Sequence, residues 1–250
     1  VSLTSTERDG VGETNGPIPF LGAVFEEGSE PAMHTKPKAS DLQEITAAVR
    51  DARQEADWVI VSIHAHEGAP GNREIPAEFL VTFAHAVIDA GADMMVGHGP
   101  HVLRAIEIYH RKPIFYSLGD FIFENETVRF QPAENYESVG LPPTALPSDF
   151  FNARSKNDTI SYPADQFFWE GMMAEPVFDK NRELQSIKVY PLELGFKQSR
   201  MHRGRPHPAS EPKAKEILAR LAKLSEPFGT KVNYDQGTGT LSWKESEKTP

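Results

Sequence analysis

The 250-residue chain contains no cysteine, fewer basic than acidic residues, and no long apolar run. The absence of cysteine excludes a disulfide framework and a thiolate metal site, and it leaves the redox compartment open. Lysine and arginine number 26 against 36 aspartates and glutamates, and the formal net charge of -10 opposes non-specific attraction to nucleic acid. No apolar run reaches the roughly 20 residues of a transmembrane helix, and no signal peptide opens the chain.

The length and the 39% hydrophobic content fit one large α/β domain over residues 1–250. Apolar spacing predicts alternating helices and strands followed by a mostly β region, with Ser40 as the N-cap of the first helix and Pro76 in the first turn of the second. Predicted helices cover residues 41–55, 76–90 and 211–224. Predicted strands cover residues 57–63, 94–96, 106–109 and 113–117, with an antiparallel pair at 167–178 and 184–194.

Two parts of the chain show little periodicity. Residues 1–40 are interpreted as a strand at 1–6 followed by a long loop. The proline-rich stretch of residues 131–163 is expected to be irregular, and either to wrap the surface or to cover the site as a lid.

Histidines directly follow two of the predicted strands. His64 ends the strand at 57–63, and His98 and His101 follow the strand at 94–96. Because loops at the carboxyl ends of strands in an α/β sheet meet at one crevice, these imidazoles can reach a common point. Gly97 and Gly99 leave little bulk beside them. The pattern favours a metal site, although a buried histidine taken alone is more often a hydrogen-bonded core residue.

Four consecutive motifs resemble the CapA family of bacterial capsule and poly-gamma-glutamate synthesis proteins, within the calcineurin-like metallophosphatase superfamily. Weaker matches extend over most of the chain and are poorest at residues 7–40. The motifs are a strand that ends in His64 with Glu67 close behind, GADMMVGHGPHVL at 91–103, IEIY at 106–109 and KPIFYSLGDF at 112–121.

The resemblance implies a metallophosphatase-like four-layer α/β sandwich with two mixed β-sheets flanked by helices. Family members open with an N-terminal half-domain that carries Gly-Asp, Asn-Leu-Glu and Asn-Asn-His stretches. No such half-domain is recognised in this chain. We therefore expect residues 1–250 to match the C-terminal portion of a longer protein, with the N-terminal part missing.

The resemblance also implies a site with two divalent metal ions, manganese, zinc or iron. His64 and His98 would bind one ion and His101 the other, with a bridging aspartate from the N-terminal half-domain. His66 and Glu67 are candidate catalytic residues, because a histidine beside a metal can protonate a leaving oxygen. Both could instead be ordinary polar residues of a loop.

Several charged residues are candidates for substrate binding. Asp120 stands where the family usually has asparagine, and it could orient a ligand or cap a turn. Arginine suits phosphate and carboxylate recognition, with a solvated loop as the alternative. The candidate arginines are Arg154, Arg203 and Arg205. His85 lies opposite the apolar stripe of its predicted helix and is expected to face solvent.

The resemblance implies a metal-dependent protein of poly-gamma-glutamate or capsule metabolism that hydrolyses phosphoester or related bonds in an anionic small-molecule or polymer substrate. Two alternatives remain open. One is a non-catalytic accessory subunit of a polymer synthase or export complex in the membrane, and the other is a metal-assisted peptide epimerase. The family is bacterial, with an extracytoplasmic or membrane-associated location. The three histidines do not separate these functions, whereas intact carboxylates in the N-terminal half would favour an enzyme.

Overall fold

The computed structural model describes residues 17–20, 23–25 and 33–243. The chain divides into two compact units, residues 1–35 and 36–250. In the first unit, β1 (Ile18–Phe20) and β2 (Ala23–Phe25) form an antiparallel hairpin that the sequence analysis missed. The predicted strand at 1–6 lies outside the described residues. A single domain over residues 1–250 stays a prediction.

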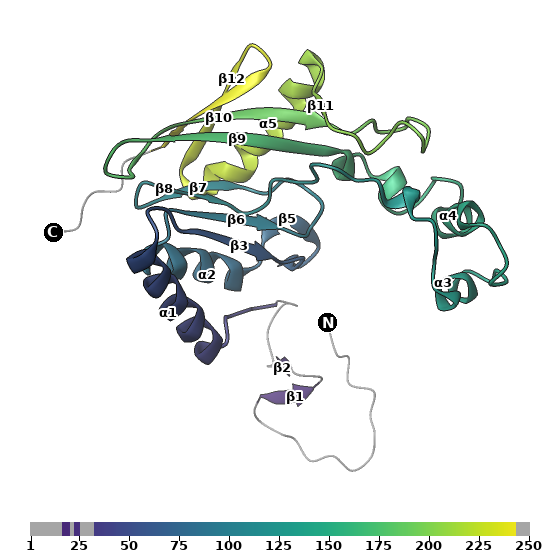
Figure 1. Ribbon diagram of the computed structural model, residues 1–250, viewed down its shortest axis with the longest axis horizontal. Helices are drawn as coiled ribbons and strands as arrows, with labels where there is room; N and C mark the ends of the chain where they lie inside the picture. The colour runs from purple at the N-terminus through teal and green to yellow at the C-terminus, as the bar shows by residue number, and fades with distance from the viewer. Residues whose placement is uncertain (1–16, 21–22, 26–32, 244–250) are drawn as a thin grey trace. The chain divides into compact units, whose positions relative to one another are not determined.

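In the second unit, a four-stranded sheet has the order β3-β6-β8-β7 (Figure 1). Strands β3, β6 and β8 are parallel, and β7 is antiparallel to β8. Helix α2 (Glu78–Asp89) connects β3 to β6, as a parallel pair requires. The strands are β3 (Ile60–His64), β6 (Met94–His98), β7 (Ile106–Tyr109) and β8 (Lys112–Phe115).

Helix α1 (Ala39–Glu55) packs with α2 on one face of this sheet. Leu80 and Val87 of α2 are fully buried there against Met95 of β6. Both predicted helices are confirmed, but neither predicted start is correct. Lys38 occupies the N-cap of α1 in place of Ser40, and Pro76 ends a strand rather than opening α2.

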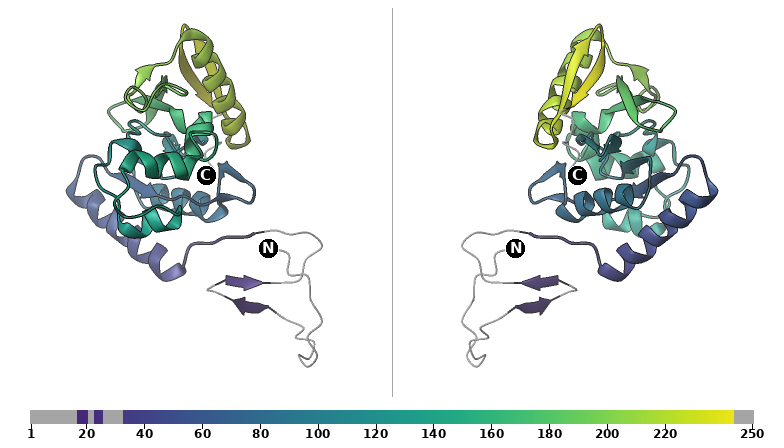
Figure 2. Two further views of the ribbon diagram at one scale, coloured as in Figure 1. Left: turned by 90° about the vertical axis from the view of Figure 1, so that its right-hand side faces the viewer. Right: turned by 90° about the vertical axis from the view of Figure 1, so that its left-hand side faces the viewer.

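A five-stranded sheet is built around β10, which pairs with β9 along one side and with β13 and β11 along the other. Helix α5 (Glu211–Ser225) packs against β10, β12 and β7, and both views of Figure 2 show it beside the C-terminal hairpin. The predicted α5 and the β9–β10 pair are confirmed. The strands are β9 (Glu170–Phe178), β10 (Leu184–Glu193), β11 (His207–Pro208), β12 (Thr230–Asp235) and β13 (Thr238–Trp243).

The two sheets share one apolar core. Phe115 of β8, Ile187 of β10 and Leu221 of α5 meet in it, each almost completely buried. Two sheets flanked by helices are the architecture that the sequence predicted. No helix in the described part of the chain is long and apolar enough to span a bilayer.

Two regions differ from the prediction. Residues 131–163 contain α3 (Ala133–Ser138) and α4 (Pro147–Ser155), which hold a small cluster of Tyr136, Phe150 and Phe151. The expectation of an entirely irregular stretch was therefore wrong. An unpredicted hairpin, β4 (Gly68–Ala69) and β5 (Asn72–Pro76), follows β3. Short 3-10 helices are η1 (Asn125–Thr127), η2 (Tyr162–Ala164), η3 (Gln166–Trp169) and η4 (Glu226–Phe228).

Candidate functional site

His64 and His98 are the last residues of neighbouring parallel strands and are paired in register. Paired residues of parallel strands project to the same face of the sheet, so the two imidazoles meet. Their Nδ1 atoms lie 2.9 Å apart, and both side chains are exposed. Ser62, two residues earlier on β3, places its Oγ 3.1 Å from His98 Nε2. The structure thus joins two of the predicted ligands.

His66 extends this group along the loop after β3. Its Nε2 lies 3.0 Å from Nε2 of His64, and its ring centroid is 5.5 Å from that of His101. Both ring nitrogens of His64 are therefore engaged, one by His98 and one by His66. Glu67 follows as an exposed residue. We name His64, His66, His98 and His101 the histidine cluster.

His101 is oriented by Asp120, from the loop after β8. The Nδ1 atom of His101 lies 3.0 Å from Oδ1 of Asp120. A carboxylate in this position accepts a hydrogen bond from Nδ1–H, so the lone pair of Nε2 is available to bind a metal, an arrangement typical of metal-binding histidines. The ring stacks on Phe168 at 5.4 Å. His101 also has a left-handed φ of 59°, which is uncommon for a residue with a side chain.

The loop around His98 requires glycine at two positions. A Cβ atom at Gly97 would lie 2.5 Å from the main-chain oxygen of Tyr116 on β8, a contact that no side chain can tolerate. Gly99 has a φ of 118°, and a Cβ there would lie 3.1 Å from Ala65 main-chain atoms and from Cδ2 of His64. The predicted tight turn with little bulk is confirmed.

Arg104 supports the loop from inside the fold, a role that the sequence analysis missed. The side chain is completely buried, and its guanidinium donates to the carbonyl oxygens of Arg73 at 2.8 Å and His66 at 3.1 Å. Burial lowers the pKa of Arg104 to about 10, while the negative charge of Glu67 opposes that shift. Arg104 therefore ties the His66 loop to the β4–β5 hairpin.

The distances within the cluster partly fit metal coordination. Two nitrogens at about 2.0–2.1 Å from one ion are roughly 2.8–3.4 Å apart for bond angles of 90–109°. The His64–His98 distance of 2.9 Å falls at the edge of this range. In the described part of the chain, however, no group of three or more His, Asp or Glu side chains has the arrangement of a metal site. Ligation by His64, His98 and His101 therefore stays a prediction.

Arg203 and Arg205 lie in one loop, on either side of Gly204. The carbonyl of Gly204 accepts a hydrogen bond from the main-chain N–H of Phe123. The Phe123 ring in turn lies 5.6 Å from the ring of His101. The Arg203 side chain is buried and paired with Glu126 and Asp158. Burial alone would lower the pKa of Arg203, but the two carboxylates raise it.

Arg205 is exposed and lies 3.3 Å from Glu124. Arg154 stands over the rings of Phe150 and Tyr162. Substrate binding by the three arginines stays a prediction. For Arg203 the ion pairs indicate a structural role, because its guanidinium is already occupied by carboxylates.

His85 faces solvent only in part, since about one-third of its side chain is exposed. Its Nε2 lies 2.8 Å from Oε1 of Glu107, and its ring stacks on Tyr109 at 4.0 Å. The hydrogen bond with Glu107 raises the pKa of His85, although partial burial opposes this. The prediction missed the partner of His85 because it considered only the residue's own helix. The partner, Glu107, comes from strand β7.

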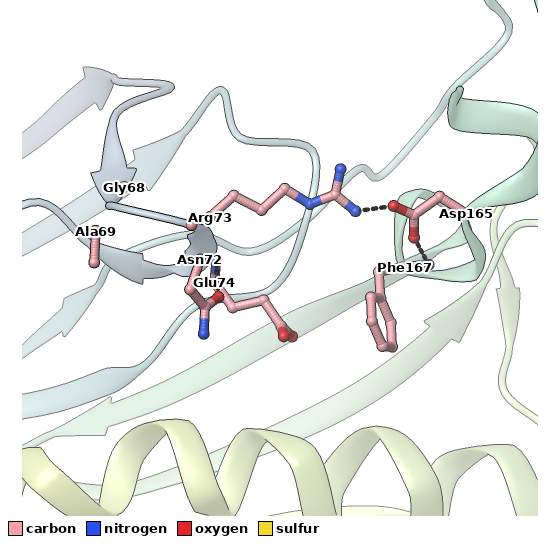
Figure 3. Close-up of a pocket in the computed structure, with 8 residues that line it drawn as sticks. Gly68, Ala69, Asn72, Arg73, Glu74, Asp165 and Phe167 are labelled. Atoms are coloured by element: carbon pink, nitrogen blue, oxygen red, sulfur yellow. Dashed lines mark hydrogen bonds and ion pairs between the residues drawn. The ribbon is translucent and has the colours of Figure 1, made fainter. Parts of the chain in front are cut away.

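A shallow hollow of about 540 Å³ lies beside the β4–β5 hairpin (Figure 3). Arg73 reaches across it to form an ion pair with Asp165, and Phe167 lies on the same side as Asp165. The Cζ atom of Arg73 stands 4.5 Å from the centre of the Phe168 ring, which also stacks on His101. Phe168 therefore contacts both Arg73, which lines the hollow, and His101 of the histidine cluster.

Residues 3–125 match the family model described as the bacterial capsule synthesis protein PGA_cap. The chain thus belongs to the CapA family of capsule and poly-glutamate synthesis proteins, as its motifs predicted.

Among individual relatives, an uncharacterized protein of Sinorhizobium fredii is 37% identical over 232 residues, which cover 89% of this chain and 49% of the relative. The PGA biosynthesis protein CapA of Bacillus subtilis is 40% identical over 84 residues, 32% of this chain and 20% of that protein. A Mycobacterium tuberculosis protein named "Probable polyglutamine synthesis accessory protein" is 39% identical over 90 residues, 34% of this chain and 22% of its own length. The chain spans about half the length of the Sinorhizobium relative.

Proposed function

We propose that this CapA-family chain supplies imidazole ligands to a divalent metal centre, and that the protein hydrolyses phosphoester or related bonds in an anionic substrate of capsule or poly-glutamate metabolism. One observation carries the proposal: His64 and His98 end adjacent parallel strands in register, with Nδ1 atoms 2.9 Å apart. Two rigid strands that deliver imidazoles to one point suit a centre that must hold its ligands firmly.

Each residue of the cluster has a proposed task. His64 and His98 would hold one ion of manganese, zinc or iron, and His101, oriented by Asp120, would offer Nε2 to a second ion. Such ions act as Lewis acids that activate water and neutralise developing negative charge. His66 is exposed beside His64 and can carry a proton to a leaving oxygen, with Glu67 next to it in the chain.

The proposal requires further ligands from outside the described residues, since the histidine cluster alone does not form a complete site. Carboxylate oxygens would suit this role, because they complement imidazole nitrogen around manganese, zinc and iron.

A second function is supported by a relative. The Mycobacterium protein is named as an accessory protein of polyglutamine synthesis. By analogy, this chain would belong to a non-catalytic partner of a polymer synthase complex in the membrane. The histidine cluster would then bind metal without turning over substrate.

The experiment compares His98→Ala with His207→Ala in the intact protein loaded with manganese or zinc. His207 is an exposed histidine of β11 and serves as the matched control. Metal content is measured by mass spectrometry, and activity with a chromogenic phosphodiester and phosphomonoester. We expect His98→Ala to lose metal and at least about 100-fold in activity, because Lewis-acid activation is worth several kcal/mol. We expect His207→Ala to retain both.

Wild-type protein and His98→Ala with equal activity and verified metal content would exclude catalysis at this centre. Metal binding by the wild type without any turnover would favour the accessory function.

A further inference from the structure

One hydroxyl and three imidazoles form a continuous row of hydrogen-bonding atoms at the ends of β3 and β6. Ser62 Oγ lies 3.1 Å from Nε2 of His98, and Nδ1 of His98 lies 2.9 Å from Nδ1 of His64. Nε2 of His64 in turn lies 3.0 Å from Nε2 of His66. Every ring nitrogen of His64 and His98 therefore has a partner, and the positions of the protons along the row depend on one another.

The row follows from the register of the two strands. Ser62 and His64 are two residues apart on β3, so their side chains lie on the same face of the sheet, and both are exposed. His98 is the partner of His64 across the parallel pair, and the two rings meet edge to face with centroids 4.8 Å apart. The Ser62 hydroxyl thus reaches the ring nitrogen of His98 that does not face His64.

The number of protons limits how the row can be occupied. A neutral imidazole carries a proton on one nitrogen and a lone pair on the other. An ion held by Nδ1 of both His64 and His98 requires both Nδ1 lone pairs, so each ring must then carry its proton on Nε2. Nε2–H of His98 is directed at Ser62, and Nε2–H of His64 is directed at His66. A serine hydroxyl has lone pairs to accept such a hydrogen bond.

We propose that Ser62 is a positioning residue of the metal centre: its hydroxyl accepts Nε2–H of His98 and so directs Nδ1 of that ring, together with Nδ1 of His64, to one ion. The role rests on the proposed function, because it needs an ion at this point. Without the hydroxyl, the His98 ring is free to turn about its Cβ–Cγ bond, which puts a carbon atom in place of Nδ1. Partners of this kind orient a ligand and raise its basicity.

His66 has the corresponding place at the other end of the row. Its Nε2 accepts Nε2–H of His64, so a neutral His66 carries its own proton on Nδ1. That proton stays available for the proposed transfer to a leaving oxygen. The two strand-end ligands are thus each held by one neighbour, Ser62 for His98 and His66 for His64.

Zinc affinity of the intact protein, measured by competition with a chelator of known affinity, tests the role of Ser62. We expect Ser62→Ala to weaken zinc binding by roughly 10–100-fold, the loss typical of such partners. Ser62→Thr keeps a hydroxyl and should recover most of the affinity. Ser186→Ala removes an exposed serine of β10 and should bind zinc as the wild type does. Because Ser62 is exposed, Ser62→Ala should melt at the wild-type temperature in EDTA.

Nitrogen-15 NMR of the histidine side chains reports the proton positions directly. In the zinc-loaded wild type, we expect His64 and His98 to bind through Nδ1 and to carry their protons on Nε2. In Ser62→Ala, the His98 signals should lose this single arrangement, while Ser62→Thr should keep it. A His98 ring that carries its proton on Nδ1 in the zinc-loaded wild type would overturn the proposal.

His98→Ala separates this inference from the proposed function. Zinc binding that falls with His98→Ala but not with Ser62→Ala would overturn the role of Ser62 and leave the metal centre standing. Zinc binding that neither substitution weakens would overturn both.

Discussion

Replacing Arg104 with methionine tests whether this buried guanidinium holds the His66 loop in place. Methionine has a similar length and no hydrogen-bond donor, so the carbonyls of Arg73 and His66 lose their partner. Leaving a fully buried carbonyl unsatisfied costs roughly 1–3 kcal/mol, so these two partly buried carbonyls together cost at most roughly 6 kcal/mol. The contact with Ala65 at 3.5 Å is too long to add much.

The free energy lost with these hydrogen bonds is largely offset, because methionine avoids the cost of burying the charged Arg104 guanidinium. Burial lowers the pKa of Arg104 to about 10, which corresponds to roughly 3 kcal/mol against the charged form. We therefore expect Arg104→Met to reduce the free energy of unfolding by only about 1 kcal/mol. Arg203→Met should cost more, up to roughly 3–5 kcal/mol, because it removes the hydrogen-bonded partner of the buried Glu126 carboxylate and leaves it only Arg200 at 3.4 Å.

Urea unfolding followed by tryptophan fluorescence measures the two stabilities, and amide hydrogen exchange measures the local effect. In Arg104→Met, we expect faster exchange in residues 65–76 and unchanged exchange in β9 and β10. Equal losses of stability in the two variants, or unchanged exchange at residues 65–76, would refute the assigned role of Arg104.

Two further predictions concern the residues around the sheet. Gly97→Ala should destabilise the protein by about 2–3 kcal/mol, because its Cβ would clash with the Tyr116 carbonyl. Gly71 has open space around it, so Gly71→Ala should cost only the roughly 1 kcal/mol of placing a side chain at a left-handed φ. Equal melting temperatures of the two variants would contradict this prediction. The raised pKa of His85 means that its ion pair with Glu107 contributes fully below about pH 6.5 and is lost as pH rises through the folded-state pKa. His85→Gln should therefore flatten the fall in unfolding free energy above that pH, and parallel curves for the two proteins would exclude this contribution.

The elements with strong periodicity were predictable from the sequence. Helix α2 has an apolar stripe and is followed by Gly91, and β9 and β10 are long strands on either side of a clear turn. The approach of His64 and His98 followed from a general property of α/β sheets, since both residues directly follow apolar strands. Each of these features can be read from the pattern of apolar and polar residues within a single helix or strand.

The missed features depend on partners that are distant in the sequence. Strands β4 and β5 are two and five residues long and carry no clear alternation. Arg104 follows Leu103 in the chain, and nothing nearby shows that its guanidinium will be buried against the carbonyls of Arg73 and His66. His85 and Glu107 are 22 residues apart, and only packing of α2 on β7 brings them together.

The in-register pairing of His64 with His98 has a consequence for how the family can diverge. Because side chains alternate between the two faces of a strand, a single-residue insertion inside β3 or β6 would turn one imidazole away from the other. The intervening hairpin and helix can change length without affecting that alignment. Insertions and deletions accepted during evolution should therefore fall between the two strands and be absent within them.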